Sequence, residues 1–322
     1  MPVRVVEGAV QHYEWGHPDF IPTFLGVASK GRPWAELWLG THPNGPTLLD
    51  DGTPLEALSG PLPYLLKILA AAEPLSLQAH PTPDQAAEGH ERGVFADPHA
   101  KPELLVALTE FEALCGFRPP ERTVELLREL GADELADVVE SDGLPAALVG
   151  LYRGGIDASS VVAACADSQR PEAHWVRTLA ERYPDDPSVA VTLLLNHVVL
   201  QPGEALHLGA GNLHGYLSGS GIELMQASDN VVRGGLTTKE VDVDLLLDTV
   251  DPTPLERPVM DAEDGRYPLP EAGVVLVTLR AGDGHTAVGH EMVIVDDGTT
   301  LYLSPGTQIF AESTTWVVTP HP

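Results

Sequence analysis

One segment rich in helix-forming residues interrupts a chain that otherwise has the pattern of short strands and tight turns. Residues 119–195 begin with Pro119-Pro120 and are rich in Ala, Leu, Glu and Arg, and Val124, Leu127 and Leu130 recur at helical spacing. The flanking residues instead form short apolar runs separated by Gly and Pro, which is typical of strands joined by turns. The sequence therefore predicts a mainly β protein with one helical insertion.

The β-type regions divide into two parts. From about residue 254 the composition changes again, and short β-rich runs at 274–280, 291–295, 299–303 and 314–318 are spaced by Gly, Asp and Pro. Such regular short strands predict a small sandwich or barrel. A chain of 322 residues is long enough for two or three packed units. We place them at 1–118 with 196–253, at 119–195, and at 254–322.

Three stretches far apart in the chain carry side chains that can bind a divalent metal. Residues two apart on a strand share a face, so a strand over 75–80 places Gln78 and His80 together. Glu103 begins another apolar run, and His214 follows a glycine-rich segment. Each residue alone is unremarkable. Together, two histidines, a carboxylate and an amide fit a catalytic zinc site with an open position, because structural zinc sites favour thiolates.

The charge of the chain restricts its partners. A net charge of −29 argues against nucleic acid, whose binding depends on neutralising phosphates. The chain has four lysines, and two of them, Lys101 and Lys239, lie close in the sequence to Glu103 and Arg233 respectively. If the substrate is an anion, its positive contacts must therefore be local.

A dense polar stretch follows His214. It combines carboxylates, cations and glycines, notably Glu223, Asp229, Arg233 and Lys239. A solvated loop would have a similar composition. Arginine, however, offers a planar bidentate fork for phosphate or carboxylate, and lysine supplies a point charge. The stretch is therefore a candidate site for a phosphorylated sugar.

Six motifs, in order, closely resemble those of type I mannose-6-phosphate isomerases, over roughly residues 3–250. They are Gln11-His-Tyr-Glu-Trp-Gly16, Ala35-Glu-Leu-Trp-Leu-Gly-Thr-His-Pro43, Leu75-Ser-Leu-Gln-Ala-His-Pro81, the run from Lys101 to Arg118, His214-Gly-Tyr-Leu-Ser-Gly219, and the run from Ala227 to Lys239. The resemblance implies a cupin (jelly-roll) β-barrel as catalytic domain, a helical insertion and a small C-terminal β domain.

The resemblance also implies roles for individual residues and a reaction. One Zn²⁺ per chain would be held by Gln78, His80, Glu103 and His214, the set that ligand chemistry also selects. The implied catalytic residues are Arg233, Glu223, Asp229 and Lys101, and the implied substrate-binding residues are Trp15, Ser76, Tyr216 and Lys239. The reaction interconverts mannose 6-phosphate and fructose 6-phosphate by proton transfer between C1 and C2 through a cis-enediol(ate). The base stays open among Glu223, Asp229 and Lys101.

The chain departs from the family pattern in a few places. The histidine that usually precedes Lys-Pro-Glu is displaced by one position, to His99, so no role is carried over to it. Gly215 and Thr238 replace a usual alanine and proline, and the C-terminal β domain is short. The other histidines, His12 and His42 among them, show no partner pattern, and we expect them on the surface or in packing.

Two other classes of protein remain as alternatives. A cupin that binds or senses a sugar phosphate without turning it over would not need Arg233, Asp229 and Lys239. A metal-dependent oxygenase would use a facial triad suited to iron, which Gln78 as a fourth ligand fits poorly.

Several features bear on location. The chain has two cysteines, no secretory-type N-terminal pattern and no apolar run of about 18 residues. We therefore expect a cytoplasmic protein with no membrane partner, and by analogy a monomer.

Overall fold

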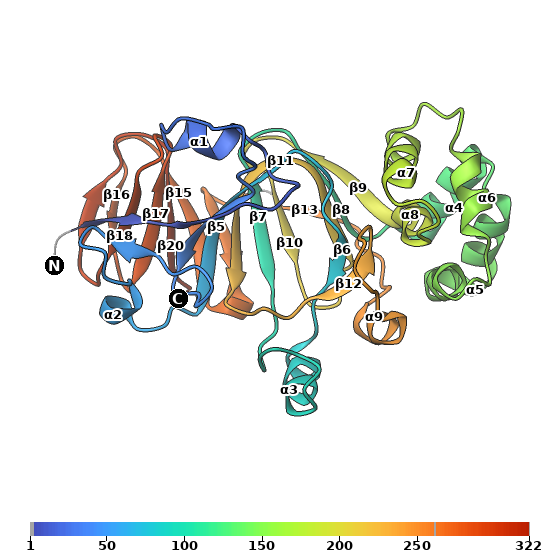
Figure 1. The fold of residues 1–322 in the computed structure, drawn as a ribbon, viewed down its shortest axis with the longest axis horizontal. Helices are drawn as coiled ribbons and strands as arrows, with labels where there is room; N and C mark the ends of the chain where they lie inside the picture. Colours follow the sequence, from blue (N-terminus) through green and yellow to red (C-terminus); the bar gives the residue numbers. More distant parts are fainter. Residues whose placement is uncertain (1–2, 261, 322) are drawn as a thin grey trace.

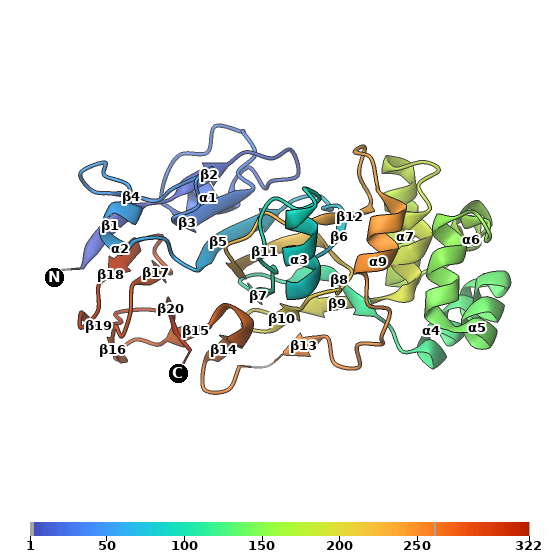
Figure 2. The ribbon, with the colours of Figure 1, turned by 90° about the horizontal axis from the view of Figure 1, so that it is seen from below.

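The computed structural model describes residues 3–260 and 262–321. Two sheets lie side by side at one end and in the middle of an elongated molecule, and helices cover the other end (Figures 1 and 2). The outermost positions of the predicted parts, residues 1, 2 and 322, and residue 261 lie outside the described residues. The prediction of a mainly β protein with helices inserted at 119–195 is confirmed.

The central sheet contains eleven strands of the described chain, ordered β13-β10-β7-β11-β5-β3-β2, with β6, β8, β9 and β12 joined to one another and to β11. These strands are β2 (Ala9–Gln11), β3 (Glu36–Gly40), β5 (Tyr64–Ala71), β6 (Leu77–Ala79), β7 (Glu103–Ala107), β8 (Phe111–Phe117), β9 (Leu195–Leu200), β10 (Ala205–Leu208), β11 (His214–Gln226), β12 (Val232–Gly235) and β13 (Val259–Met260). Within the described residues, β2, β13, β9 and β12 have open edges, so the pairings do not close into a ring.

Strand β11 joins the two halves of this sheet. Its first half pairs with β6 and β8, and from Gly219 onward it pairs with β5 and β7. The change of direction falls at Gly219, whose φ is +116°. A Cβ there would lie 2.6 Å from the carbonyl oxygen of Glu110, so only glycine allows this close approach.

The helical insertion contains α4 (Pro120–Leu130), α5 (Asp133–Tyr152), α6 (Ala158–Ala164), α7 (Pro171–Arg182), α8 (Ser188–Val191) and the 3₁₀ turn η1 (Thr192–Leu194). Proline occupies the first turn of α4 and α7, and Gly131 ends α4 in the left-handed conformation. Leu127 and Leu130 are buried, as their spacing predicts. The core of the insertion is continuous with β6 and β12 through Leu77 and Val232.

The second sheet has the order β14-β15-β20-β17-β18-β1-β4. Its strands are β14 (Arg266–Leu269), β15 (Val274–Leu279), β20 (Thr315–Pro320), β17 (Glu291–Val295), β18 (Thr300–Leu303), β1 (Arg4–Glu7) and β4 (Leu48–Leu49). The four β-rich runs predicted after residue 254 are thus strands of one sheet. The pairing of β1 and β4 with them was not indicated by the sequence, and the division into 1–118 with 196–253, 119–195, and 254–322 stays a prediction.

Short elements complete the fold. They are α1 (Phe20–Phe24), α2 (Glu56–Ser59), α3 (Pro83–Glu91), α9 (Val243–Thr249), the 3₁₀ turn η2 (Pro270–Ala272) and the hairpin of β16 (Gly284–Thr286) with β19 (Gln308–Phe310). In the described chain, no helix has both the length and the apolar character needed to cross a membrane.

Strand β5 is buried along its whole length because it lies between two layers. Leu66 and Ile68 pack into the core shared with the second sheet. Alternation places Leu65, Lys67 and Leu69 on the opposite face, where they line a cavity. One strand therefore contributes both to the main core and to the candidate site.

Candidate active site and metal centre

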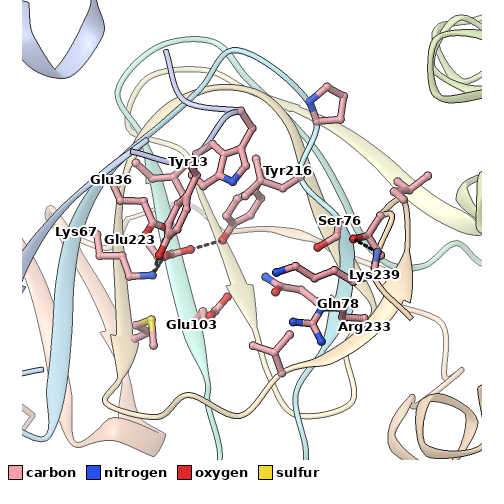
Figure 3. A pocket seen from close by; sticks show the side chains of 18 of the residues that line it. Tyr13, Glu36, Lys67, Ser76, Gln78, Glu103, Tyr216, Glu223, Arg233 and Lys239 are labelled. Atoms are coloured by element: carbon pink, nitrogen blue, oxygen red, sulfur yellow. Dashed lines mark hydrogen bonds and ion pairs between the residues drawn. The ribbon is translucent and has the colours of Figure 1, made fainter. Parts of the chain in front are cut away.

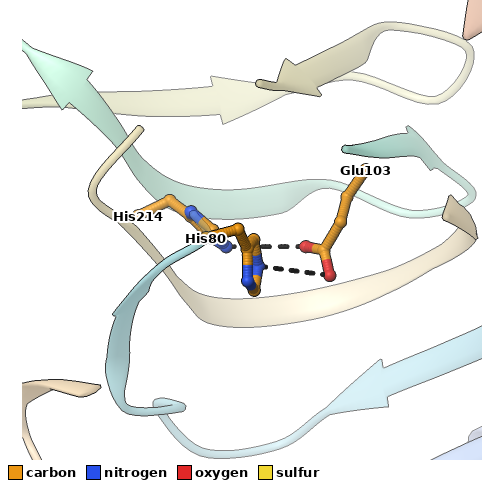
Figure 4. A group of neighbouring side chains, drawn as sticks. All are labelled: His80, Glu103 and His214. Atoms are coloured by element: carbon orange, nitrogen blue, oxygen red, sulfur yellow. Dashed lines mark ion pairs between the residues drawn. The ribbon is translucent and has the colours of Figure 1, made fainter. Parts of the chain in front are cut away.

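Two histidines and one carboxylate meet at the centre of the sheet (Figure 4). His80 follows β6, Glu103 begins β7 and His214 begins β11, and all three are almost completely buried. Glu103 Oε1 lies 3.4 Å from His80 Nε2, and its Oε2 lies 3.5 Å from His214 Nε2. One ligand atom from each residue lies within 4.8 Å of the others, so a single metal ion can contact all three.

The orientation of both imidazoles suits metal binding. His80 Nδ1 donates to the carbonyl oxygen of Asn230 at 2.8 Å, and His214 Nδ1 donates to that of Asn212 at 2.9 Å. A carbonyl oxygen can only accept, so each Nδ1 carries the proton and each Nε2 presents its lone pair to the centre. Hydrogen bonds of this kind fix the ring and tautomer of metal-binding histidines.

Buried atoms without partners support the same interpretation. His80 Nε2 and Glu103 Oε2 are buried and have no hydrogen-bond partner. Such atoms are rare in folded proteins because desolvation is costly, and a cation would satisfy both.

Charge states complete the test of fit. Burial lowers the pKa of His80 to about 4. Burial raises the pKa of Glu103, but Lys101 and His80 more than offset this and hold it well below its usual range. Near neutral pH the centre therefore offers a neutral imidazole and a carboxylate, the forms that bind zinc.

Gln78 reaches the same centre from β6. Its Nε2 lies 3.2 Å from His214 Nε2, and a half-turn of the amide group places its oxygen there instead. Gln78 and His214 are directly paired across β6 and β11. The four residues that ligand chemistry selects in the sequence are thus brought together.

A cavity of about 850 Å³ opens beside the metal centre (Figure 3). Ten of the twelve predicted site residues line it: Trp15, Ser76, Gln78, Lys101, Glu103, Tyr216, Glu223, Asp229, Arg233 and Lys239. The other two, His80 and His214, are fully buried and are not among the lining residues. Three of the four lysines of this acidic chain line the cavity, which concentrates positive charge there.

At one end of the cavity a lysine is buried among carboxylates. Lys67 Nζ donates to Glu223 Oε2 at 2.8 Å and lies 3.5 Å from Glu36 Oε1, and Tyr216 donates its hydroxyl to Glu223 Oε1 at 2.9 Å. Burial raises the pKa of Glu223, and Lys67 only partly opposes this. Burial lowers the pKa of Lys67, but Glu223 and Glu36 outweigh it and raise the value. This end is a fixed, desolvated network of charges.

The opposite end is cationic. Ser76, Arg233 and Lys239 lie together in Figure 3. Arg233 is exposed and stands opposite Gln78 in the pairing of β12 with β6. In the part of the chain that the structure describes, neither Arg233 nor Lys239 forms an ion pair, so both remain available to an anion. Lys101 is buried nearby, with its Nζ 3.1 Å from Glu103 Oε1.

Several lining residues were not identified from the sequence. Lys67 and Glu36 are among them, although a single charge within the apolar run of β5 was a usable signal. His42, expected on the surface or in packing, is buried, lines the cavity, and has its Nε2 3.1 Å from Asp229 Oδ1. It also contacts Trp38 edge to face, with ring centroids 4.9 Å apart.

Comparison with known proteins agrees with this geometry. The family model described as "Phosphomannose isomerase type I, catalytic domain" matches residues 50–120. The mannose-6-phosphate isomerase of Salmonella typhimurium is 32% identical, over 94% of this chain and 93% of its own length. That of Escherichia coli is 33% identical, over 81% of this chain and 80% of its own length.

The chain belongs to the type I mannose-6-phosphate isomerase family. The predictions of the family and of an isomerase enzyme are thereby confirmed. The apo crystal structure of the Salmonella typhimurium enzyme superposes with a TM-score of 0.82 at 27% identity, and the match covers 100% of both chains. A mannose 6-phosphate isomerase solved with zinc and yttrium matches with a TM-score of 0.80 at 28% identity, over 100% of this chain and 97% of that one. The expected fold is therefore confirmed as that of the family.

Proposed function

We propose that this chain interconverts mannose 6-phosphate and fructose 6-phosphate, using one zinc ion held by Gln78, His80, Glu103 and His214. The observation that carries the proposal is the arrangement of the cavity. Unpartnered metal-ligand atoms lie beside it, free cations line one end, and a buried carboxylate lies at the other. A sugar binder without turnover would need the cations but not the desolvated carboxylate.

The cationic end would receive the phosphate group. Ser76 can donate its hydroxyl and Lys239 supplies a point charge, while the guanidinium of Arg233 is the cation paired in register with Gln78. We assign Arg233 to stabilising negative charge between the phosphate and the metal end, because a fixed cation in a confined site needs no reorganisation during reaction. Trp15 and Tyr216 then serve as walls of the cleft.

Glu223 is our choice for the group that moves the proton between C2 and C1. Its carboxylate faces the cavity, Lys67 and Tyr216 fix its orientation, and burial raises its pKa toward the range of an efficient general base. Asp229 is half-exposed and pairs with His42, and Lys101 is engaged with Glu103. Zinc bound at the centre supplies a Lewis acid that polarises the sugar carbonyl and orients the open chain.

A coupled assay tests the proposal. Purified protein should convert mannose 6-phosphate to fructose 6-phosphate, lose this activity on chelation and regain it with zinc. Absence of turnover after zinc is restored would refute the enzymatic function. In the variant Arg233→Ala, turnover should fall severely while bound zinc stays near one per chain. Loss of zinc in that variant would show that Arg233 supports the fold instead.

We also propose a monomeric protein of the cytoplasm with no nucleic-acid or membrane partner. The two buried free cysteines and the strongly acidic composition support this. Sedimentation of the zinc-loaded protein at several concentrations would measure its oligomeric state.

A further inference from the structure

The strand that carries Arg233 lies at an open edge of the sheet. Strand β12 pairs with β6 on one side, and in the described residues no other strand pairs with it. Its pairing is irregular between Arg233 and Gly235, where a bulge shifts the register. Backbone groups on the free side of an edge strand need other partners, because unpaired buried N–H and C=O groups are costly.

Side chains of the helical insertion provide these partners. Tyr152, the last residue of α5, donates its hydroxyl to the carbonyl oxygen of Gly234. The amide of Leu236 is shared between Asp186 Oδ2 and Ser188 Oγ, each at 2.9 Å. Asp186 Oδ1 also accepts from the amide of Ser188 at 2.9 Å, which fixes the two acceptors relative to each other.

The contact is tight and conformationally constrained. Ser188 is fully buried, and a Cβ at Gly235 would lie 2.1 Å from its Oγ. Leu236 has a φ of +52° and Asp185 a φ of +62°, a conformation that side chains other than glycine rarely adopt. Strained residues on both sides of one contact persist only where the surroundings hold them in place.

The same contact borders the cavity. Arg182 and Tyr183 from the end of the insertion line it, as do Leu236 and Lys239 after β12. We infer that the helical insertion acts as a positioning element, in which Tyr152, Asp186 and Ser188 hold β12 so that Arg233 faces the metal centre. This inference rests on the proposed function for its effect on turnover, but the physical contact can be tested separately.

Removing single hydroxyl groups tests the inference. Tyr152→Phe and Ser188→Ala should each lower kcat/KM for mannose 6-phosphate by about 10- to 100-fold, because small displacements of a reacting group have effects of this size. The matched control is Thr192→Val, which removes a buried hydroxyl that bonds only to Val189 within the same helical turn. It should retain wild-type kcat/KM, and all three variants should keep wild-type zinc content.

A double-mutant cycle separates positioning from general loss of stability. In the background of Arg233→Ala, Ser188→Ala should cause no further loss of activity, because Arg233 is the group that Ser188 acts through. A loss that multiplies with that of Arg233→Ala would overturn the inference. So would wild-type activity in both Tyr152→Phe and Ser188→Ala.

Hydrogen exchange gives a readout that does not depend on turnover. Amide exchange in peptides covering 232–238 should be faster in Ser188→Ala than in the wild type and Thr192→Val. Unchanged exchange would overturn the inference even if the enzyme is active. Faster exchange in a protein without isomerase activity would instead uphold the contact and refute the proposed function.

Discussion

Replacing Lys67 with methionine should destabilise the protein in a pH-dependent way. The change keeps the length of the side chain and removes its charge, leaving Glu223 and Glu36 buried without their shared cation. With an effective dielectric constant of about 20, the ion pairs at 2.8 and 3.5 Å correspond to roughly 6 and 5 kcal/mol of attraction. Desolvation offsets much of this, and removing one partner of a buried pair costs about 3–5 kcal/mol.

The direction of the pH effect follows from Glu223. Its pKa in the folded protein is already raised by burial, and removing Lys67 raises it further. A carboxyl group with a raised pKa contributes stability at low pH, and that contribution is lost as pH rises from the ordinary glutamate value of about 4.3 through the folded pKa. The deficit of Lys67→Met should therefore be largest at pH 7–8 and shrink toward pH 5.

Urea denaturation at a series of pH values measures this deficit. The matched variant Lys67→Met with Glu223→Gln removes both members of the closer pair and should recover part of the lost stability. A deficit below about 1 kcal/mol would place the pair in the range of exposed ion pairs. Together with a deficit that does not change with pH, it would refute the assignment of Lys67 as the counter-ion of a desolvated carboxylate.

Three further predictions concern the site and the core. Glu103→Gln should abolish stoichiometric zinc binding, measured by metal analysis after dialysis, because a neutral amide replaces the only carboxylate ligand; retained zinc would exclude Glu103 from the metal centre. Glu223→Gln should lower kcat by about 10²–10⁴-fold and, in deuterated water, stop solvent exchange at C1 and C2, with zinc retained; normal exchange would assign the base elsewhere. Cys115 and Cys165 should not react with a thiol reagent in the native protein, because both are buried and burial raises the pKa of Cys115 to about 12; rapid labelling would contradict the packing described.

Local patterns in the sequence predicted much of the fold and the metal centre. The spacing of Leu127 and Leu130 indicated a helix, and strand alternation placed Gln78 beside His80. These are short-range properties of the chain. The resemblance of long motifs then supplied Arg233 and Lys239 as candidates for an anionic substrate.

Contacts between distant strands were not predictable in the same way. Lys67 meets Glu223 because β5 and β11 pair in one register, and the two residues are 156 positions apart. His42 reaches Asp229 across 187 positions. A register is set by the packing of whole layers, so no local pattern reports it.

The pairing of β1 with β18 has a consequence for biosynthesis. Thr300 donates its hydroxyl to the carbonyl oxygen of Val6, 294 positions away. At about 5–20 residues per second, a ribosome needs roughly 15–60 s to make the intervening chain. During that time β1 is an unpaired strand beside a sheet that does not yet exist, so nascent chains depend on chaperones or on rapid collapse to avoid pairing with one another.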